Sequence, residues 1–361
     1  MQLEKQTCFQ NVCFSLWLLV QYHQLIKGKC GVKKIIGIGL GLCLLCGCQA
    51  QPQRYSDQRY DLFDTLIVLT AYCDNRAEFD AMSALVFGEF ERLHGLFDIY
   101  GAADKGLARL NAMAGQGPQT MEPEVLQLLA LGKEGYALTD GKVNIAMGAV
   151  LQLWSAAREA ALDDPENAAL PDAAALREAA QHCDIADLAL DEQAGTAELR
   201  DSRMCIDAGA VAKGFATGLV ADALRQAGYT DFVISAGGNV WAEGAPPGAE
   251  GWGVGVMSPD ESGRLLTTMT VTDCAVVTSG GYLRYFSVNG VRYHHIIDPE
   301  TLMPSDAVLS ATVVCGDSGM ADVLSTACFM LPENESAALI QKVGGARLLV
   351  LNKDGELVEV P

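Results

Sequence analysis

An acidic and a hydroxyl side chain lie one helical turn apart in Gly319–Met330, a stretch whose pattern predicts a helix. Asp322 and Thr326 are four residues apart, so their oxygens share one face of that helix. A carboxylate and a hydroxyl suit a hard, oxygen-preferring cation such as Mg²⁺, which keeps waters and substrate phosphates as its other ligands. An alternative stays open, in which Asp322 interacts with the helix dipole and Thr326 hydrogen-bonds a carbonyl of its own helix.

Small residues surround an aspartate and a lysine in Cys205–Leu224, which has the sequence CIDAGAVAKGFATGLVADAL. A strand end at Asp207 that leads through small residues into a helix lets the backbone approach a bulky anion. The helix N-terminus then offers free N–H groups. Lys213 adds a positive charge for a phosphate, and a backbone carbonyl near Ala210 is a candidate third ligand for the cation. The alternative is a buried strand–helix junction with a surface lysine.

Two adjacent histidines, His294 and His295, are the strongest acid–base candidates. They end the returning strand of a predicted hairpin whose turn is Asn289-Gly290, a dipeptide typical of tight β-turns. Successive side chains of a strand point to opposite faces, so at most one of the two histidines faces a site. The alternative for either is an ordinary hydrogen-bonded strand histidine. The sequence has no Gly-x-Ser-x-Gly elbow and no Walker-type loop, which argues against serine hydrolases and P-loop enzymes.

The elements that must position these residues come in mixed order. Runs of β-branched residues predict strands, and apolar residues at helical spacing predict helices. We expect strands at 60–73, near 188, 198 and 205, and at 232–235, 252–256, 266–271, 275–278 and 309–314. We expect helices at 76–98, 123–139, 155–182, 214–224 and 319–330, and a loop with an apolar segment at 142–154. Hairpins in the second half favour an α+β fold over a regular βαβ series.

The N-terminal residues carry the pattern of a secretion signal. Lysines precede a short apolar run, Ile35–Cys46, and the ending Leu45-Cys46-Gly47-Cys48 resembles a lipobox. We therefore expect Cys48 to be the lipidated first residue of an extracytoplasmic bacterial lipoprotein held at the cell membrane. A start codon assigned too far upstream explains the first 30 residues best, and a genuine extension is the alternative. The expected organisation is a signal region at 1–47, a polar tether at 48–58 and one domain at 59–361.

The chain is strongly acidic. Its formal net charge is −20, and removal of residues 1–47 takes away five lysines and one glutamate, which gives −24. This charge argues against binding to nucleic acid or to an anionic membrane surface. A protein of this charge needs a cation in order to handle phosphate groups.

Five motifs resemble those of the ApbE family of flavin transferases, which are lipoprotein FAD:protein FMN transferases. The motifs are Ile206-Asp207-Ala208-Gly209-Ala210-Val211-Ala212-Lys213-Gly214, Ala236-Gly237-Gly238-Asn239, Thr278-Ser279-Gly280 with Arg284-Tyr285-Phe286, His295-Ile296-Ile297-Asp298-Pro299, and Ala321-Asp322-x-x-Ser325-Thr326. The likeness runs from Tyr60 to the C-terminus and agrees with the lipobox. It implies a two-lobed α+β domain with mixed or antiparallel sheets, packed helices and an active site between the lobes.

The resemblance implies a Mg²⁺-dependent reaction in which FAD is split at its pyrophosphate, FMN moves to a threonine hydroxyl of an acceptor protein, and AMP leaves. It makes His295 the candidate base, and an ordinary histidine pKa of about 6.5 suits proton abstraction near neutral pH. The metal ligands that it implies are Asp322, Thr326 and the carbonyl of Ala210. The residues that it implies for FAD binding are Phe63, Tyr100, Lys142, Val143, Asn144, Asp207, Lys213 and Ile296.

Two residues depart from the pattern of that family. Phe63 stands where the family usually has methionine, and Leu302 stands where it generally has glycine. Two other functions stay open. One is a Mg²⁺-dependent FAD pyrophosphatase, in which water replaces the acceptor and gives FMN and AMP. The other is a non-enzymatic flavin-binding lipoprotein, against which the presence of Asp322, Thr326 and His295 argues.

Overall fold

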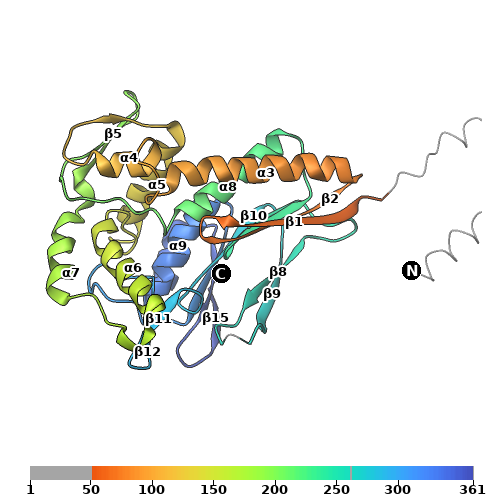
Figure 1. Ribbon diagram of the computed structural model, residues 1–361. Helices are drawn as coiled ribbons and strands as arrows, with labels where there is room; N and C mark the ends of the chain where they lie inside the picture. Colours follow the sequence, from red (N-terminus) through yellow and green to blue (C-terminus); the bar gives the residue numbers. More distant parts are fainter. Residues whose placement is uncertain (1–50, 261, 361) are drawn as a thin grey trace, which may run out of the picture. The chain divides into compact units, whose positions relative to one another are not determined.

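An eight-stranded antiparallel sheet is the largest element of the fold (Figure 1). The computed structural model describes residues 51–260 and 262–360, so the signal region and Cys48 lie outside the described residues. The strand order is β1-β2-β6-β7-β10-β13-β14-β15. In that order the strands span Gln53–Leu62, Thr65–Cys73, Phe232–Ala236, Asn239–Glu243, Cys274–Gly280, Ser310–Cys315, Arg347–Leu351 and Leu357–Val360.

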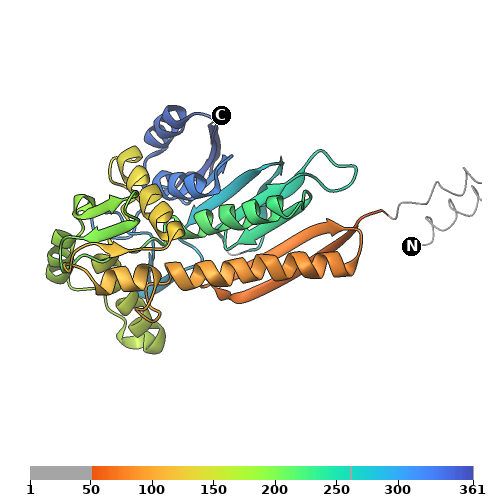
Figure 2. The same cartoon turned by 90° about the horizontal axis from the view of Figure 1, so that it is seen from above.

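Helices cover one face of this sheet, and a two-stranded hairpin covers part of the other. The helices on the first face are α3 (Arg76–Phe97), α8 (Ala212–Gln226), α9 (Ser318–Met330) and α10 (Glu333–Val343). Helix α3 runs along the β1–β2 hairpin (Figure 2). The second face is covered by β8 (Trp252–Met257) and β9 (Leu265–Val271). There, Trp252 and Val254 pack with Val276 and Val314 of the large sheet.

A small sheet with the order β3-β5-β4 packs with two of the remaining helices, and the other two pack against each other. Its strands span Gln119–Thr120, Thr196–Leu199 and Leu188–Asp191, and the helices are α4 (Gly106–Ala112), α5 (Pro123–Leu138), α6 (Gly148–Asp163) and α7 (Ala173–Ala179). A separate two-stranded hairpin, β11 (Tyr285–Val288) with β12 (Val291–His294), packs against α6. In this contact the Trp154 ring lies 6.3 Å from the rings of Phe286 and Tyr293.

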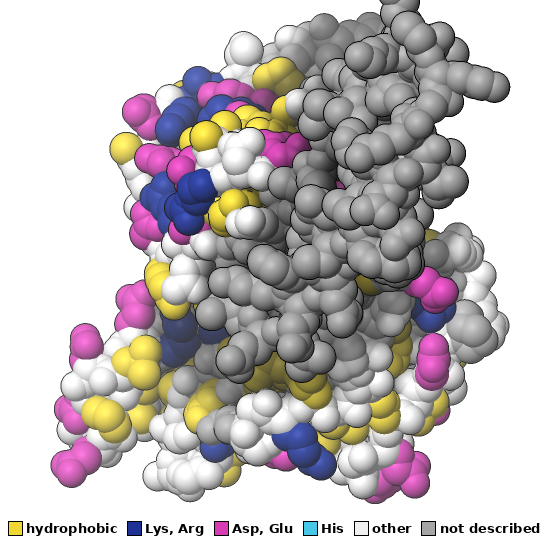
Figure 3. Space-filling model, turned by 90° about the vertical axis from the view of Figure 1, so that its right-hand side faces the viewer, with side chains coloured by type: hydrophobic (Ala, Val, Ile, Leu, Met, Phe, Trp, Pro, Cys, Tyr) yellow, Lys and Arg dark blue, Asp and Glu magenta, His cyan; other side chains and the backbone are white. Residues whose placement is uncertain are grey.

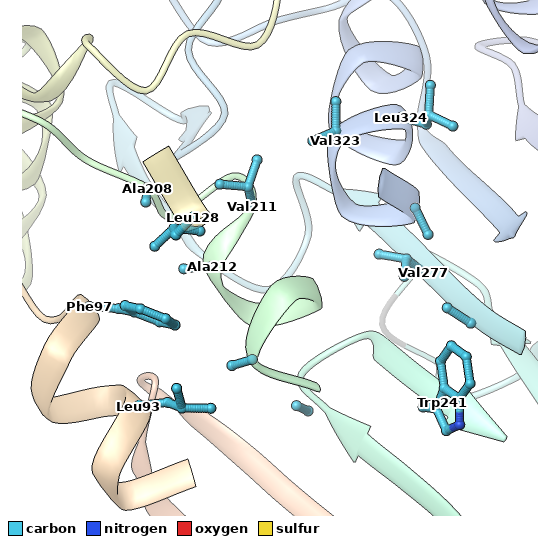
Figure 4. Close-up of a cluster of buried hydrophobic side chains, with 14 of the residues drawn as sticks. Leu93, Phe97, Leu128, Ala208, Val211, Ala212, Trp241, Val277, Val323 and Leu324 are labelled. Atoms are coloured by element: carbon cyan, nitrogen blue, oxygen red, sulfur yellow. The ribbon is translucent and has the colours of Figure 1, made fainter. Parts of the chain in front are cut away.

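Buried apolar side chains from several helices meet in one core (Figure 4). Leu93 comes from α3, Leu128 from α5, Val211 from the residue before α8 and Val323 from α9, and solvent reaches none of these four side chains. Burial of each such side chain contributes about 1.5–3 kcal/mol relative to exposure. The core therefore fixes the start of α8 against α9, which is where the candidate site lies.

The predicted fold class is confirmed. The structure is α+β, and every strand pair in the described sheets is antiparallel. The helices expected at 76–98, 123–139 and 319–330 are present as α3, α5 and α9. Over residues 51–260 and 262–360, no helix combines the length and the hydropathy that crossing a bilayer requires.

The N-terminal hairpin differs from the prediction of a tether up to residue 58 and a single strand at 60–73. Strand β1 begins at Gln53, within the predicted tether, and a second strand starts at Thr65. The side chains of β1 are mostly exposed and polar, so no apolar alternation marks the strand in the sequence. The connecting turn, Phe63-Asp64, also lacks the glycine or asparagine that typically indicates a two-residue turn.

Two further segments differ from the prediction. Part of the segment at 142–154, expected as a loop with an apolar run, forms the start of α6. The strand expected near residue 205 is a single bridge between Met147 and Cys205. A short apolar run does not determine which element it forms, which explains the error at 142–154. The bridge at Cys205 depends on the distant Met147, and spacing along the chain does not predict that contact.

The packing of α8 against α9 predicts different effects of alanine at two glycines of α8. A Cβ atom on Gly214 would lie 2.3 Å from the Ser318 carbonyl oxygen, whereas one on Gly218 would lie 3.6 Å from the Ser318 Cβ. We expect Gly214→Ala to lower the free energy of unfolding by about 1–3 kcal/mol because the site is overpacked. We expect Gly218→Ala to raise it by up to about 1 kcal/mol because alanine favours a helix. Denaturant unfolding measures both, and equal effects would contradict the close approach at Gly214.

Candidate functional site

The first turn of α8 departs from regular helical hydrogen bonding where it meets α9. The Gly214 N–H donates to Oδ2 of Asp322 at 2.8 Å. In a regular helix this N–H would donate to the carbonyl of Ala210, four residues earlier. Among the described residues, no donor reaches the Ala210 carbonyl oxygen. The α8–α9 contact thus leaves the Ala210 carbonyl oxygen unpaired, one helical turn before the residue that bonds the buried carboxylate of Asp322.

The carboxylate of Asp322 is almost completely buried, with 3% of the residue exposed. Burial raises its pKa, against the lowering effects of the Lys213 charge and of hydrogen bonds from Gly214 and Asn239. Asn239 is itself 2% exposed, and its Oδ1 has no hydrogen-bond partner in the described part of the chain. A buried carboxylate next to an unpaired amide oxygen is an arrangement that a bound cation would stabilise.

Three hydroxyl groups continue this polar site. Ser279 Oγ lies 2.9 Å from Ser325 Oγ and 3.4 Å from Thr326 Oγ1, and Ser325 Oγ donates to the Asp322 carbonyl at 3.1 Å. Ser325, rather than Thr326, therefore makes the hydrogen bond back to its own helix. The Thr326 hydroxyl keeps lone pairs for another ligand.

The residues present fit Mg²⁺. The donor set of Asp322, Thr326 and the Ala210 carbonyl consists of hard oxygen atoms, which Mg²⁺ prefers. Residues 51–260 and 262–360 contain no group of three or more His, Cys, Asp or Glu side chains that could hold a metal. A cation at this site would therefore take its remaining ligands from water and from a bound phosphate.

The start of α8 carries the features of an anion site. Lys213 is the second residue of the helix, and its Nζ donates to the Gly209 carbonyl at 3.1 Å. The Gly209 N–H donates to Asp207 Oδ1 at 2.9 Å. Burial raises the pKa of Asp207, and the Gly209 hydrogen bond and the Lys213 charge oppose this effect. Lys213 thus lies close to both Asp207 and Asp322, and a phosphate would meet its charge at a helix N-terminus.

The two histidines occupy different environments. His294 ends β12, and both of its ring nitrogens are engaged. Nε2 lies 2.8 Å from the Ser305 carbonyl oxygen, and Nδ1 accepts the Ile296 N–H at 3.2 Å. His295 follows the strand and is exposed to solvent, with its Nδ1 3.3 Å from the Arg284 carbonyl oxygen. No described atom hydrogen-bonds its Nε2, so His295 has a ring nitrogen available for chemistry.

The electrostatic surroundings of His295 keep its ring neutral. Partial desolvation and then the positive charges of Lys213, Arg284 and His294 lower the pKa of His295 to about 3. Solvent reaches the side chain of His295. The charge of Lys213 affects the pKa of both His295 and Asp322, so these two side chains both lie near the start of α8.

The predicted flavin-binding residues Tyr100, Phe63 and Ile296 lie around this centre. Tyr100 is 65% exposed, and its pKa is raised by desolvation and by the charge of Asp207, against a hydrogen bond with Ser155. Phe63 is half-buried and holds the turn between β1 and β2. Ile296 is half-buried and directly follows His295. An exposed aromatic ring beside Asp207 provides a face on which a planar ring system can stack.

The three residues of the predicted flavin-binding segment 142–144 differ in what they contact. Lys142 Nζ forms ion pairs with Asp298 at 3.1 Å and Glu300 at 3.2 Å, in the loop that follows His295. Desolvation opposes protonation of Lys142, but these two carboxylates outweigh it and raise its pKa. The side chain of Val143 is buried in the core. Asn144 Nδ2 donates to the Cys183 carbonyl at 2.9 Å. Of the three, only Lys142 is shown to contact the loop next to the site.

Leu302, which departs from the family's usual glycine, adopts the conformation that favours glycine. Its φ is +59°. Its N–H donates to the Asp298 carbonyl at 2.8 Å, and its carbonyl accepts the Trp154 Nε1–H at 3.0 Å. The left-handed conformation costs a leucine about 1–2 kcal/mol. The loop therefore keeps its shape through these hydrogen bonds rather than through glycine.

Three residues of the site lie in the five motifs given above, but the sequence alone did not predict a role for them. They are Asn239, Ser279 and Arg284. Asn239 directly follows the tight turn Gly237-Gly238, and a buried polar residue after such a turn is the only local signal for its role. The contacts that bring these residues to the site join distant segments, and spacing along the chain does not predict them.

These features describe an α+β protein in which a cluster of oxygen atoms at Asp322 and Thr326 lies beside the helix start that carries Lys213. A family model described as the ApbE family matches residues 63–350. The chain is 32% identical to a FAD:protein FMN transferase of Treponema pallidum, over 88% of this chain and 91% of that protein. It is 30% identical to a FAD:protein FMN transferase of Klebsiella pneumoniae, over 77% of this chain and 84% of that protein.

Solved structures agree with this result. The crystal structure of the ApbE protein from Thermotoga maritima has a TM-score of 0.73 and 25% identity, and the match covers 85% of this chain and 96% of that one. The flavin transferase ApbE from Vibrio cholerae has the same fold, with a TM-score of 0.71 and 21% identity over 85% of this chain and 97% of that one. This chain belongs to the ApbE family.

The lowered pKa of His295 predicts how its ring and the protein respond to acid. We expect the His295 ring to stay neutral down to about pH 4, because its pKa is about 3. Its unfolded pKa is about 6.5, so below that pH the unfolded chain binds the proton more readily and stability falls. NMR titration of the ring measures the pKa directly. His295→Gln should reduce the loss of stability between pH 7 and pH 4, and a His295 pKa near 6.5 would contradict this environment.

Proposed function

We propose that this chain is a Mg²⁺-dependent transferase that moves FMN from FAD to a threonine hydroxyl of an acceptor protein and releases AMP. One observation carries the proposal: the charge of Lys213 acts on Asp207, Asp322 and His295 alike. An anion-binding charge, a cation ligand and a possible base therefore share one site. The relatives named FAD:protein FMN transferase support the same reaction.

The reaction balances as follows. The threonine oxygen forms a bond to the phosphorus on the FMN side of the pyrophosphate. The bond from that phosphorus to the bridging oxygen breaks, and AMP leaves with this oxygen. The hydroxyl proton passes to a base. The products are a phosphodiester between FMN and threonine, and AMP.

The chain's own residues bind and orient the two phosphates. Lys213 and the first turn of α8 would bind the pyrophosphate. Asp322, Thr326 and the Ala210 carbonyl would hold Mg²⁺, which neutralises the pyrophosphate and stabilises charge on the phosphoryl group. Tyr100 offers a surface for stacking. With a net charge of −20, the chain as a whole repels phosphate, so these few groups must supply the attraction.

His295 would take the proton from the acceptor hydroxyl through Nε2. Its pKa of about 3 keeps the ring neutral and able to accept a proton at pH 7. The positive charges of Lys213 and Arg284 contribute to that low value. A bound pyrophosphate would offset these charges and raise the His295 pKa towards the range in which general bases are effective.

The two histidines provide a matched pair of variants. We expect His295→Ala to bind FAD normally and to lose single-turnover FMN transfer by about 10²–10⁴-fold, because the base is lost. His294→Ala should keep transfer and lower thermal stability, since both ring nitrogens of His294 bond the backbone and its ring packs 5.3 Å from Phe329. Transfer is read as flavin fluorescence of the acceptor band in a denaturing gel.

The same assay distinguishes the alternatives. Free FMN and AMP without labelled acceptor would indicate a pyrophosphatase, in which water takes the place of threonine. FAD binding with no FMN or AMP formed would indicate a non-enzymatic flavin-binding protein. An inactive His294→Ala together with an active His295→Ala would show that the base is assigned to the wrong histidine.

We also propose that the chain is an extracytoplasmic lipoprotein held at a bacterial cell membrane through lipid on Cys48. The support is the lipobox-like sequence Leu45-Cys46-Gly47-Cys48. On the described part of the face shown in Figure 3, side chains of both charges lie among hydrophobic ones. Cys48→Ala should release the protein from membranes and abolish lipid labelling, whereas Cys46→Ala should do neither. Membrane fractions with unchanged lipid labelling in Cys48→Ala would contradict the anchor.

A further inference from the structure

The turn between β1 and β2 has a strained backbone. Phe63 has a φ of +53° and Asp64 a φ of +50°, so two successive residues other than glycine adopt the left-handed conformation. Aspartate tolerates this region, but for a bulky residue such as phenylalanine it is a clear outlier. Such a conformation costs on the order of 1–3 kcal/mol and persists only where the surrounding structure holds it.

Two side chains hold the backbone of this turn. His94 Nδ1 accepts the Phe63 N–H at 3.4 Å. The guanidinium of Arg284 donates to the Phe63 carbonyl at 3.4 Å and also to the Asp64 carbonyl. The Phe63 ring packs near the rings of His94 at 5.3 Å and Phe90 at 6.1 Å. Arg284 is thus fixed by its side chain to a turn some 220 residues away in the sequence.

The backbone of Arg284 reaches His295. The Arg284 carbonyl oxygen lies 3.3 Å from His295 Nδ1. A carbonyl oxygen only accepts hydrogen bonds, so in the neutral ring Nδ1 must carry the proton. Nε2 is then left with its lone pair. The hydrogen bond therefore selects the tautomer in which the open nitrogen, Nε2, can accept a proton.

We propose that Arg284 is a positioning residue for the reaction. Its guanidinium hydrogen-bonds the strained Phe63-Asp64 turn, and its carbonyl holds His295 in the tautomer with a free Nε2. This inference rests on the proposed function in so far as His295 is the base. The turn serves as the fixed point, because β1 and β2 hold its two ends through their pairing. Without the hydrogen bonds of the guanidinium, the loop at 281–284 would no longer be fixed to the turn. The Arg284 carbonyl would then no longer be held against His295.

Three variants test the proposal. Arg284→Met removes the guanidinium and keeps most of the side chain, and Arg284→Lys keeps the charge but not the fork that reaches two carbonyls. Arg264→Met is the control, because Arg264 is exposed and its guanidinium pairs with Asp260 in the loop before β9. Thermal unfolding of all three verifies that they fold. If Arg284→Met does not fold, Arg284→Lys is used for the same measurements.

The first readout is ¹⁵N NMR of the ring nitrogens without FAD or acceptor, with the His295 signals assigned by their loss in His295→Gln. Wild type and Arg264→Met should show a protonated Nδ1 and a bare Nε2. Arg284→Met should show a mixture of tautomers. The second readout is single-turnover FMN transfer, which should fall by about 10–10²-fold with nearly unchanged FAD affinity, as expected for a misplaced base.

Two results would overturn the proposal. One is an unchanged His295 tautomer in Arg284→Met. The other is a large loss of FAD affinity at an unchanged tautomer, which would make Arg284 a phosphate-binding residue instead. The NMR readout needs no turnover. If wild type transfers no FMN while the tautomer still shifts in Arg284→Met, the proposed function fails and the positioning by Arg284 stands.

Discussion

The contact on which the site depends is the hydrogen bond from the Gly214 N–H to Asp322. It requires that α8 and α9 approach so closely that a Cβ on residue 214 would lie 2.6 Å from the Asp322 Cβ. Glycine is therefore needed for its lack of a side chain and not for an unusual backbone angle. The same contact draws the Gly214 N–H away from Ala210 and leaves that carbonyl without a donor in the described residues. One interhelical hydrogen bond thus shapes two of the three proposed cation ligands.

Charge balance links this contact to the rest of the site. Lys213 lies near the buried carboxylate of Asp322, the half-buried carboxylate of Asp207 and a neutral histidine, in a chain with a net charge of −20. Each carboxylate has a raised pKa through burial, so each would gain from a further positive charge. A bound cation would supply that positive charge to Asp322. A pyrophosphate bound with it would bring negative charge to Lys213. The substrate and the cation are thus expected to bind together better than either binds alone.

Much of the fold and of the site could be predicted from local sequence patterns. The four-residue spacing of Asp322 and Thr326 correctly predicted a shared helix face, because helical periodicity is a local property. The motif from Asp207 to Gly214 correctly predicted a helix that starts next to Lys213. The edge strand β1 was not predicted, since polar exposed residues carry no periodic signal and only pairing with β2 defines the strand.

The roles of Asn239 and Arg284 could not be predicted for a different reason. Asn239 reaches Asp322 from the first position of β7, and Arg284 reaches a turn 220 residues away. These contacts exist only in the folded chain. Likewise, strand alternation predicted that the two histidines differ, but His295 lies beyond the end of β12. What distinguishes the histidines is the packing of His294 against Ser305 and Phe329, not the face of a strand.

The most direct test of this account is to locate the cation. Mn²⁺ prefers the same oxygen ligands as Mg²⁺, and its anomalous X-ray scattering identifies it in crystals grown with FAD. The account predicts one strong anomalous peak in direct contact with Asp322, Thr326 and the Ala210 carbonyl, and no such peak in Asp322→Ala. A peak at other residues, or an unchanged peak in Asp322→Ala, would contradict it.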